Sequence, residues 1–121
     1  MRSEQMRDIV VKALEESKGI EVHVLDVRAL TDITDVMVIA SGSSDRHVKG
    51  LAEAVRDTMR EHGIRPLGVE GEAEGEWVLL DFGDVLVHVM RPKTRAFYDL
   101  EKFWSEDLGR AIKAHRIKQQ E

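Results

Sequence analysis

Two apolar stretches separated by a short glycine-containing turn constrain the fold of this 121-residue chain more than any other feature. They run from Trp77 to Asp81 and from Asp84 to Met90, with Phe82-Gly83 between them. Glycine can adopt the positive φ angle that a two-residue hairpin turn requires. The pattern therefore predicts an antiparallel strand pair in which Asp81 lies opposite Asp84.

The two faces of this hairpin are expected to differ, because side chains alternate along a strand. The predicted register places Trp77 opposite His88, on one face with Leu79 and Leu86. The other face is entirely aliphatic and is predicted to be core; it consists of Val78, Leu80, Val85 and Val87. Two interpretations of the Trp77/His88 face stay open. It either lies beneath a helix, with His88 hydrogen-bonded, or is partly open and binds a partner.

Charge is distributed unevenly along the chain. No lysine or arginine occurs between Arg65 and Arg91, but this segment carries six acids: Glu70, Glu72, Glu74, Glu76, Asp81 and Asp84. The whole chain has 23 acids and 18 bases, for a net charge of −5, so the remaining residues hold 17 acids and 18 bases. An acidic hairpin on a nearly neutral domain predicts a basic partner.

Length and composition predict a single globular domain over residues 1–108, followed by a basic tail over residues 109–121. The chain has no cysteine, which excludes disulfides and thiol catalysis. No apolar run approaches the roughly 20 residues that span a bilayer, and the first residues lack a signal-peptide core, so we expect no membrane association and a cytoplasmic location. A pI near 5.6 argues against general nucleic-acid binding.

Hydrophobic periodicity predicts the other elements. A helix is expected from Glu4 to Ser17, capped by Ser3 and ended by Gly19. Further elements are a strand over residues 21–27, a buried strand over residues 35–40, a helix ended by Gly63, and a strand near residues 67–70. One mixed sheet of about five strands with helices packed on it is the predicted α/β fold, and the strand–helix–strand passage over residues 36–70 is expected to form a right-handed unit.

The last predicted helix follows Pro92, with Thr94 as its cap. One side of it is expected to pack on the domain, through Phe97, Leu100, Glu101, Trp104 and Leu108. Tyr98 falls on the opposite side and is predicted to be an exposed aromatic near the end of the hairpin. Such a residue is a candidate interface anchor.

The passage Ser41-Gly42-Ser43-Ser44 is the one place where the sequence suggests catalysis, which would use the Gly42–Ser44 turn. A strand–turn–helix passage points amide groups at an anion, so a nucleotide-binding or nucleotidyltransferase-like enzyme is the alternative function. The sequence has no Asp-x-Asp pair to hold metal ions, no lysine of the kind found in phosphate-binding loops, and no metal-ligand spacing among its histidines. We therefore favour a helix-capping turn and predict no catalytic residue, cofactor or metal.

Several motifs together resemble one known family. They are the hairpin Trp77–Val89, the segment Arg95-Ala-Phe97-Tyr98-Asp-Leu100-Glu101 with Trp104, the segment Thr34–Ser44 with His47-Val48, and Glu70-Gly71. Over about residues 10–104 the chain resembles the ribosomal silencing factor (RsfS, or Iojap-like) family. Two positions depart from its pattern. Val36 and Phe82 stand where the family often has an aromatic residue and a tyrosine, so any hydrogen bond of that tyrosine hydroxyl is missing here.

The resemblance implies a nucleotidyltransferase-like shape without the catalytic acids, and a role that is not enzymatic. It implies binding to the large ribosomal subunit through ribosomal protein number fourteen. That contact would block an intersubunit bridge and the joining of the small subunit, and so repress translation when nutrients are scarce. The acidic hairpin and the resemblance together predict the contact residues: Trp77, Asp81, Phe82, Asp84, His88, Arg95, Tyr98 and Glu101.

Two further surfaces have open interpretations. The basic tail is either a solvated arm, which we favour, or a minor contact with ribosomal RNA. The apolar second face of the hairpin offers a homodimer contact that would compete with the ribosomal partner.

Overall fold

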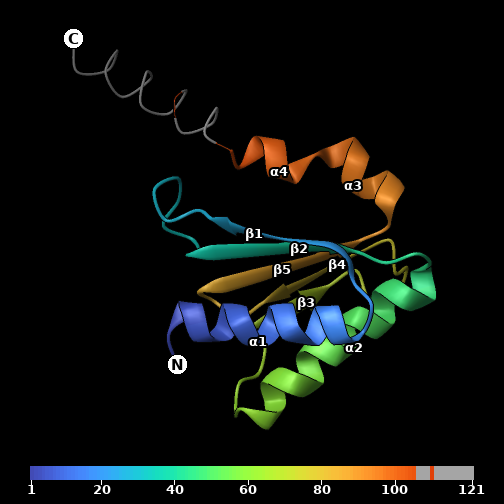
Figure 1. Cartoon of the computed structure of the whole chain (residues 1–121), viewed down its shortest axis with the longest axis horizontal. Helices are drawn as coiled ribbons and strands as arrows, with labels where there is room; N and C mark the ends of the chain where they lie inside the picture. Colours follow the sequence, from blue (N-terminus) through green and yellow to red (C-terminus); the bar gives the residue numbers. More distant parts are fainter. Residues whose placement is uncertain (106–109, 111–121) are drawn as a thin grey trace.

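A single mixed sheet with helices on both faces organises the chain in the computed structural model, which describes residues 1–105 and residue 110 (Figure 1). The elements are, in order, α1 (Ser3–Glu16), β1 (Ile20–Asp26), β2 (Val36–Ser41), α2 (Asp45–Glu61), β3 (Gly68–Glu70), β4 (Trp77–Asp81), β5 (Val85–Met90), α3 (Pro92–Tyr98) and α4 (Leu100–Phe103). The predicted α/β class with one mixed five-stranded sheet is confirmed.

The strand order is β1-β2-β5-β4-β3, and only the β2/β5 pair is parallel. The strand–helix–strand passage runs from β2 through α2 to β3, which is parallel to β2 in the same sheet. The two strands are not neighbours, because β2 pairs with β5 and β3 lies at the far edge. Burial explains the order. All six residues of β2 and five of the six in β5 are buried, whereas none of the three in β3 is. The most apolar strands occupy the middle of the sheet, and the short polar strand is left at its edge.

Helices α1 and α2 cover one face of the sheet, and α3 and α4 lie over the other (Figure 1). The main core lies beneath α1 and α2. It is built from the apolar stripes of both helices and from one face of the central strands, including Val10, Leu14, Leu51, Val55, Val38, Val78, Leu80, Val87 and Val89. The predicted core face of the hairpin belongs to this cluster, so that prediction is confirmed.

The register of the hairpin differs from the predicted one by two residues. Asp81 pairs with Leu86 rather than with Asp84, and the N–H of Phe82 donates to the carbonyl of Val85 at 3.0 Å. The Asp81 carboxylate accepts a hydrogen bond from the N–H of Gly83 at 2.8 Å, the local pattern by which aspartate stabilises a wider turn. Because the shift is an even number, every side chain keeps its predicted face. Gly83 has the expected positive φ, at 84°.

Two predicted helix caps are wrong. Arg2, not Ser3, is the N-cap of α1, and the buried Ser3 hydroxyl instead donates to the Asp35 carboxylate at 2.5 Å. Pro92 takes the first position of α3, so Thr94 lies inside that helix and donates to the Glu76 carboxylate at 3.0 Å. Both hydroxyls join elements that are far apart in sequence, which local spacing does not reveal.

The predicted last helix is divided at Asp99, whose φ is 48°. Residues before and after this break do not share one helical face. Phe97, which we expected to pack on the domain, is consequently 80% exposed. Tyr98 is 53% exposed, which confirms the prediction for that residue. Leu108 and the basic tail, Arg110 excepted, lie outside the described residues.

No helix within the described part of the chain is both long enough and apolar enough to cross a membrane.

Gly71 provides a stability test with a matched control. Its φ is 84°, and a Cβ there would lie 1.9 Å from the carbonyl oxygen of Trp77. We expect Gly71→Ala to lower the free energy of unfolding by about 1–3 kcal/mol, because strain at positive φ and the clash add. Gly50 lies within α2 and a Cβ there would meet nothing within 4 Å, so Gly50→Ala should raise stability by about 0.5–1 kcal/mol. Urea unfolding measures both, and equal stabilities would contradict this account.

Candidate functional site

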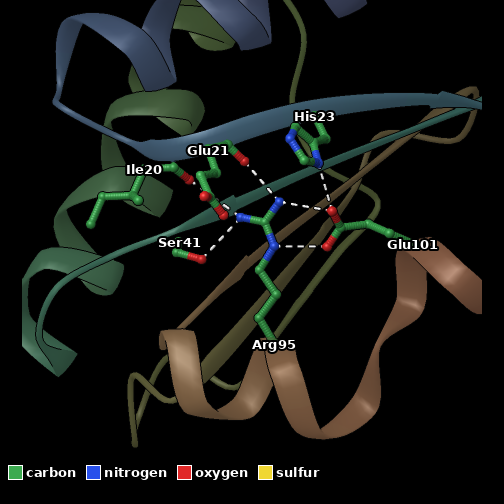
Figure 2. Close-up of polar contacts among 6 residues, drawn as sticks. All are labelled: Ile20, Glu21, His23, Ser41, Arg95 and Glu101. Carbon is green, nitrogen blue, oxygen red and sulfur yellow. Dashed lines mark hydrogen bonds and ion pairs between the residues drawn. The ribbon is translucent and has the colours of Figure 1, made fainter.

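The side chain of Arg95 organises the face of the sheet beneath α3 and α4. Arg95 is only 6% exposed, and its guanidinium points from α3 toward β1 and β2 (Figure 2). Its Nε and Nη2 donate to the two oxygens of Glu101 at 2.8 and 3.1 Å. This two-point geometry is the strong form of an arginine–carboxylate pair. It joins α3 to α4 across the break at Asp99.

A bulge in the edge strand β1 and Ser41 at the end of β2 supply the remaining partners of the guanidinium. The β1/β2 register shifts between Ile20 and His23, and Glu21 has a φ of 46°. The carbonyls of Ile20 and Glu21 accept hydrogen bonds from Arg95 at 3.3 and 2.8 Å, and the hydroxyl of Ser41 accepts one at 3.0 Å. A bulge redirects backbone groups out of the regular ladder. Arg95 thus fixes α3 to two strands with its buried charge fully hydrogen-bonded.

Glu101 also contacts the edge strand directly. Its Oε2 lies 2.6 Å from Nδ1 of His23 on β1 (Figure 2). The hydrogen bond from Arg95, and to a smaller extent the one from His23, holds the pKa of Glu101 below its ordinary value, although partial burial opposes this shift. Glu101 is therefore ionised at neutral pH and tethers α4 to β1.

Aromatic side chains form the exposed part of this face, which we call the aromatic face: Trp77, Phe97 and Tyr98. The ring centroids of Trp77 and Tyr98 are 4.8 Å apart, and those of Tyr98 and Phe97 are 5.0 Å apart. Trp77 is half-buried, whereas the other two are exposed. Contiguous exposed aromatic rings are typical of protein interfaces.

His88 lies buried below Trp77 and is 6% exposed. The indole N–H of Trp77 donates to Nδ1 of His88 at 3.0 Å, which leaves the ring hydrogen on Nε2. Burial lowers the pKa of His88 from 6.5 to about 4, so the ring is neutral at pH 7. Nε2 finds no hydrogen-bond partner in the described part of the chain. The hairpin's second face is thus covered at His88 and partly exposed at Trp77, and the binding of a partner there stays a prediction.

The structure separates the eight predicted contact residues into two groups. Trp77, His88, Arg95, Tyr98 and Glu101 gather around the aromatic face. Asp81, Phe82 and Asp84 lie at the other end of β4, at the hairpin turn. Three of the eight residues are buried and form no part of the surface: Phe82, which packs in the main core, is 7% exposed, and His88 and Arg95 are each 6% exposed.

Phe97 and the glutamates next to Trp77 are not among the contact residues that the sequence predicts. The helical periodicity places Phe97 on a buried side, because the break at Asp99 has no strong sequence signal. Four of the six acids, Glu70 to Glu76, belong to β3 and to the connection that leads into Trp77. The charge segregation could have identified them, because most of the acidic segment precedes Trp77 rather than following it.

The Ser41–Ser44 turn is occupied by its own hydrogen bonds. The N–H of Ser43 donates to Nδ1 of His47 at 2.9 Å, and the N–H of His47 donates to the hydroxyl of Ser44 at 3.0 Å. The N–H of Gly42 donates to the carbonyl of Met90 at 3.0 Å. Ser44 is the N-cap of α2, so the helix-capping interpretation is confirmed. Within residues 1–105 and 110, no group of three or more acids and histidines is placed to hold a metal ion.

The chain is similar to the proteins of one known family. The sequence model of the family described as "Ribosomal silencing factor during starvation" matches residues 1–121. The chain belongs to the ribosomal silencing factor family. The resemblance seen in the sequence is confirmed.

Members of the family share both sequence and shape with the chain. The ribosomal silencing factor RsfS of Chromobacterium violaceum is 42% identical over 86% of the chain and 85% of its own length. A crystal structure of a C. violaceum protein, also 42% identical, superposes with a TM-score of 0.84 over 86% of the chain and 87% of its own. The mouse protein named "Mitochondrial assembly of ribosomal large subunit protein 1" is 31% identical over 81% of the chain and 44% of its own length.

His88 gives the domain a predicted pH dependence. The folded ring takes up a proton near pH 4 and an unfolded histidine near pH 6.5, so the unfolded state binds more protons between these values. Stability contributed by the neutral ring is therefore lost as the pH falls from 6.5 to 4, by up to about 3 kcal/mol. Urea unfolding at several pH values should show this loss in the free energy of unfolding of the parent, and a shallower slope of that free energy against pH in His88→Gln.

The matched control is His62→Gln, which removes an exposed imidazole at the end of α2. A parent whose stability is constant from pH 6.5 to 4, or an unchanged slope in His88→Gln, would contradict the buried neutral histidine.

Proposed function

We propose that the chain binds the large ribosomal subunit and prevents the small subunit from joining it, which represses translation when nutrients are scarce. The proposed contact is ribosomal protein number fourteen, at an intersubunit bridge. Membership of the ribosomal silencing factor family supports the regulatory role. The name of the mouse relative, which refers to the ribosomal large subunit, supports the choice of subunit. The proposed location is the cytoplasm.

The observation that carries this proposal is the meeting of exposed aromatic rings and unneutralised acids at one end of the hairpin. Phe97 and Tyr98 are 80% and 53% exposed. Glu74 and Glu76 lie beside Tyr98, line a hollow with it, and form no ion pair with any described residue. Ribosomal proteins are basic because they bind RNA, so an acidic, aromatic surface complements one electrostatically and in its apolar contacts.

The mechanism that this surface supports is steric. A protein that inhibits by occupying a docking surface needs a rigid contact face, and the Arg95 contacts hold α3 in one place on the sheet. It needs no reactive group. A homodimer formed through the apolar second face of the hairpin would compete with the ribosome, and we propose it as a second use of this surface.

Co-sedimentation with purified large subunits tests the proposal. We expect Phe97→Ala plus Tyr98→Ala to weaken binding by about tenfold or more, because central interface aromatics commonly contribute that much. The same variant should lose the ability to keep the two subunits apart in a sucrose gradient. The control is Ile33→Ala plus Leu67→Ala, which removes two residues that are 79% and 78% exposed and belong to other segments.

The control variant is expected to bind as the parent does. If the parent fails to sediment with large subunits, the proposed function is wrong. If the control weakens binding and the aromatic variant does not, the contact surface is misassigned.

A further inference from the structure

A small hollow lies where the β3–β4 connection meets α3. Its volume is about 270 Å³, and its lining residues are Gly71, Glu74, Glu76, Trp77, Thr94 and Tyr98. Pockets that enclose a drug-sized molecule commonly measure about 300–1,000 Å³. The hollow is therefore suited to one side chain of a partner rather than to a nucleotide.

Two aromatic rings and two carboxylates give this hollow its chemical character. The rings of Trp77 and Tyr98 are 4.8 Å apart and tilted by 51°. The face of an aromatic ring is negative and attracts a cation within about 6 Å of its centre. Glu74 and Glu76 add two negative charges, and none of the described residues that line the hollow is a cation.

The carboxylate of Glu76 is held in position. It accepts a hydrogen bond from the hydroxyl of Thr94 at 3.0 Å, and Thr94 is buried in the first turn of α3. One acidic wall is therefore fixed to the same helix that carries Tyr98. Because the site is already formed before a partner binds, less side-chain conformational entropy is lost on binding.

The cations nearest in the fold lie in the adjoining hollow. Glu74 and Glu76 also line that second hollow, together with Asp45, Arg91, Lys93 and Thr94. The Arg91 guanidinium is paired with Asp45 at 2.7 Å and not with either glutamate. Lys93 lines the adjoining hollow and not the aromatic one, so the described residues that line the aromatic hollow carry a net negative charge.

We propose that this hollow receives a single arginine side chain from the basic partner of the domain. The inference rests on the proposed function, because it assigns the contact chemistry of the same surface. Arginine fits better than lysine, since its planar guanidinium stacks on an aromatic ring while bonding to carboxylates. The chain itself shows the same preference, because Arg95 uses its planar fork to bind Glu101.

The first test measures large-subunit binding by Glu74→Gln plus Glu76→Gln. Glutamine keeps the size of each side chain and retains an oxygen that can accept the Thr94 hydrogen bond. We expect binding to weaken roughly three- to tenfold, because two favourable charges are removed. The matched control, Glu53→Gln plus Glu61→Gln, makes the same charge change on exposed positions of α2, over the opposite face of the sheet.

The second test does not use the ribosome. A short peptide, acetyl-Gly-Arg-Gly-amide, is titrated into the full chain while the indole N–H resonance of Trp77 is followed by NMR; a Trp104→Phe variant assigns that resonance. The same peptide with citrulline in place of arginine removes the charge and keeps the shape. We expect a saturable shift with arginine, none with citrulline, and at least a threefold weaker response in the double glutamine variant.

The outcomes separate this inference from the proposed function. If the parent binds large subunits and the double glutamine variant binds as tightly as its control, the arginine hollow is wrong and the function stands. If the parent does not bind large subunits, the proposed function is wrong, and the peptide titration alone tests whether the hollow binds arginine. Equal responses to the arginine and citrulline peptides, or no response to either peptide, would overturn the inference that the hollow binds arginine. Circular dichroism verifies that each variant is folded.

Discussion

The buried guanidinium of Arg95 is the interaction on which the functional face depends. It connects four parts of the chain: α3, which carries it, α4 through Glu101, the bulge of β1, and Ser41 at the end of β2. Removing one member of such a buried pair typically costs about 3–5 kcal/mol, because the other charge is left without compensation. The interaction therefore specifies where α3 and α4 lie, and with them the aromatic face.

The two faces of the sheet are covered through different kinds of contact. The face beneath α1 and α2 is an apolar core that holds most of the buried side chains. Polar contacts fix α3 and α4 over the other face, including the hydrogen bonds of Arg95 with Ser41 and of Glu101 with His23. Because polar contacts fix α3 and α4 to the sheet, the rings of Phe97 and Tyr98 are free to project outward. This division explains how a small domain can be stable and still expose Phe97 and Tyr98.

Much of the fold could be predicted from local patterns, because strand alternation and helix periodicity reflect burial directly. The hairpin faces, the buried strand β2 and the helix-capping turn after it are examples. The register of the hairpin could not be predicted in this way, since it depends on the hydrogen bond between Asp81 and the amide of Gly83. Contacts between distant segments were also hidden: nothing near Arg95 in the sequence shows that its partners include two carbonyls more than 70 residues away. The charge pattern identified the acidic segment but not which end of the hairpin would join the aromatic rings.

The most direct test of the account is a photo-cross-linking experiment that asks which end of the hairpin meets the large subunit. A benzophenone amino acid is placed at position 97 or at position 67, where Phe97 and Leu67 are 80% and 78% exposed. If the aromatic face is the contact surface, we expect efficient cross-links from position 97 to a protein of the large subunit, and few from position 67. Cross-links from position 67 alone would contradict the assignment of the aromatic face as the contact surface.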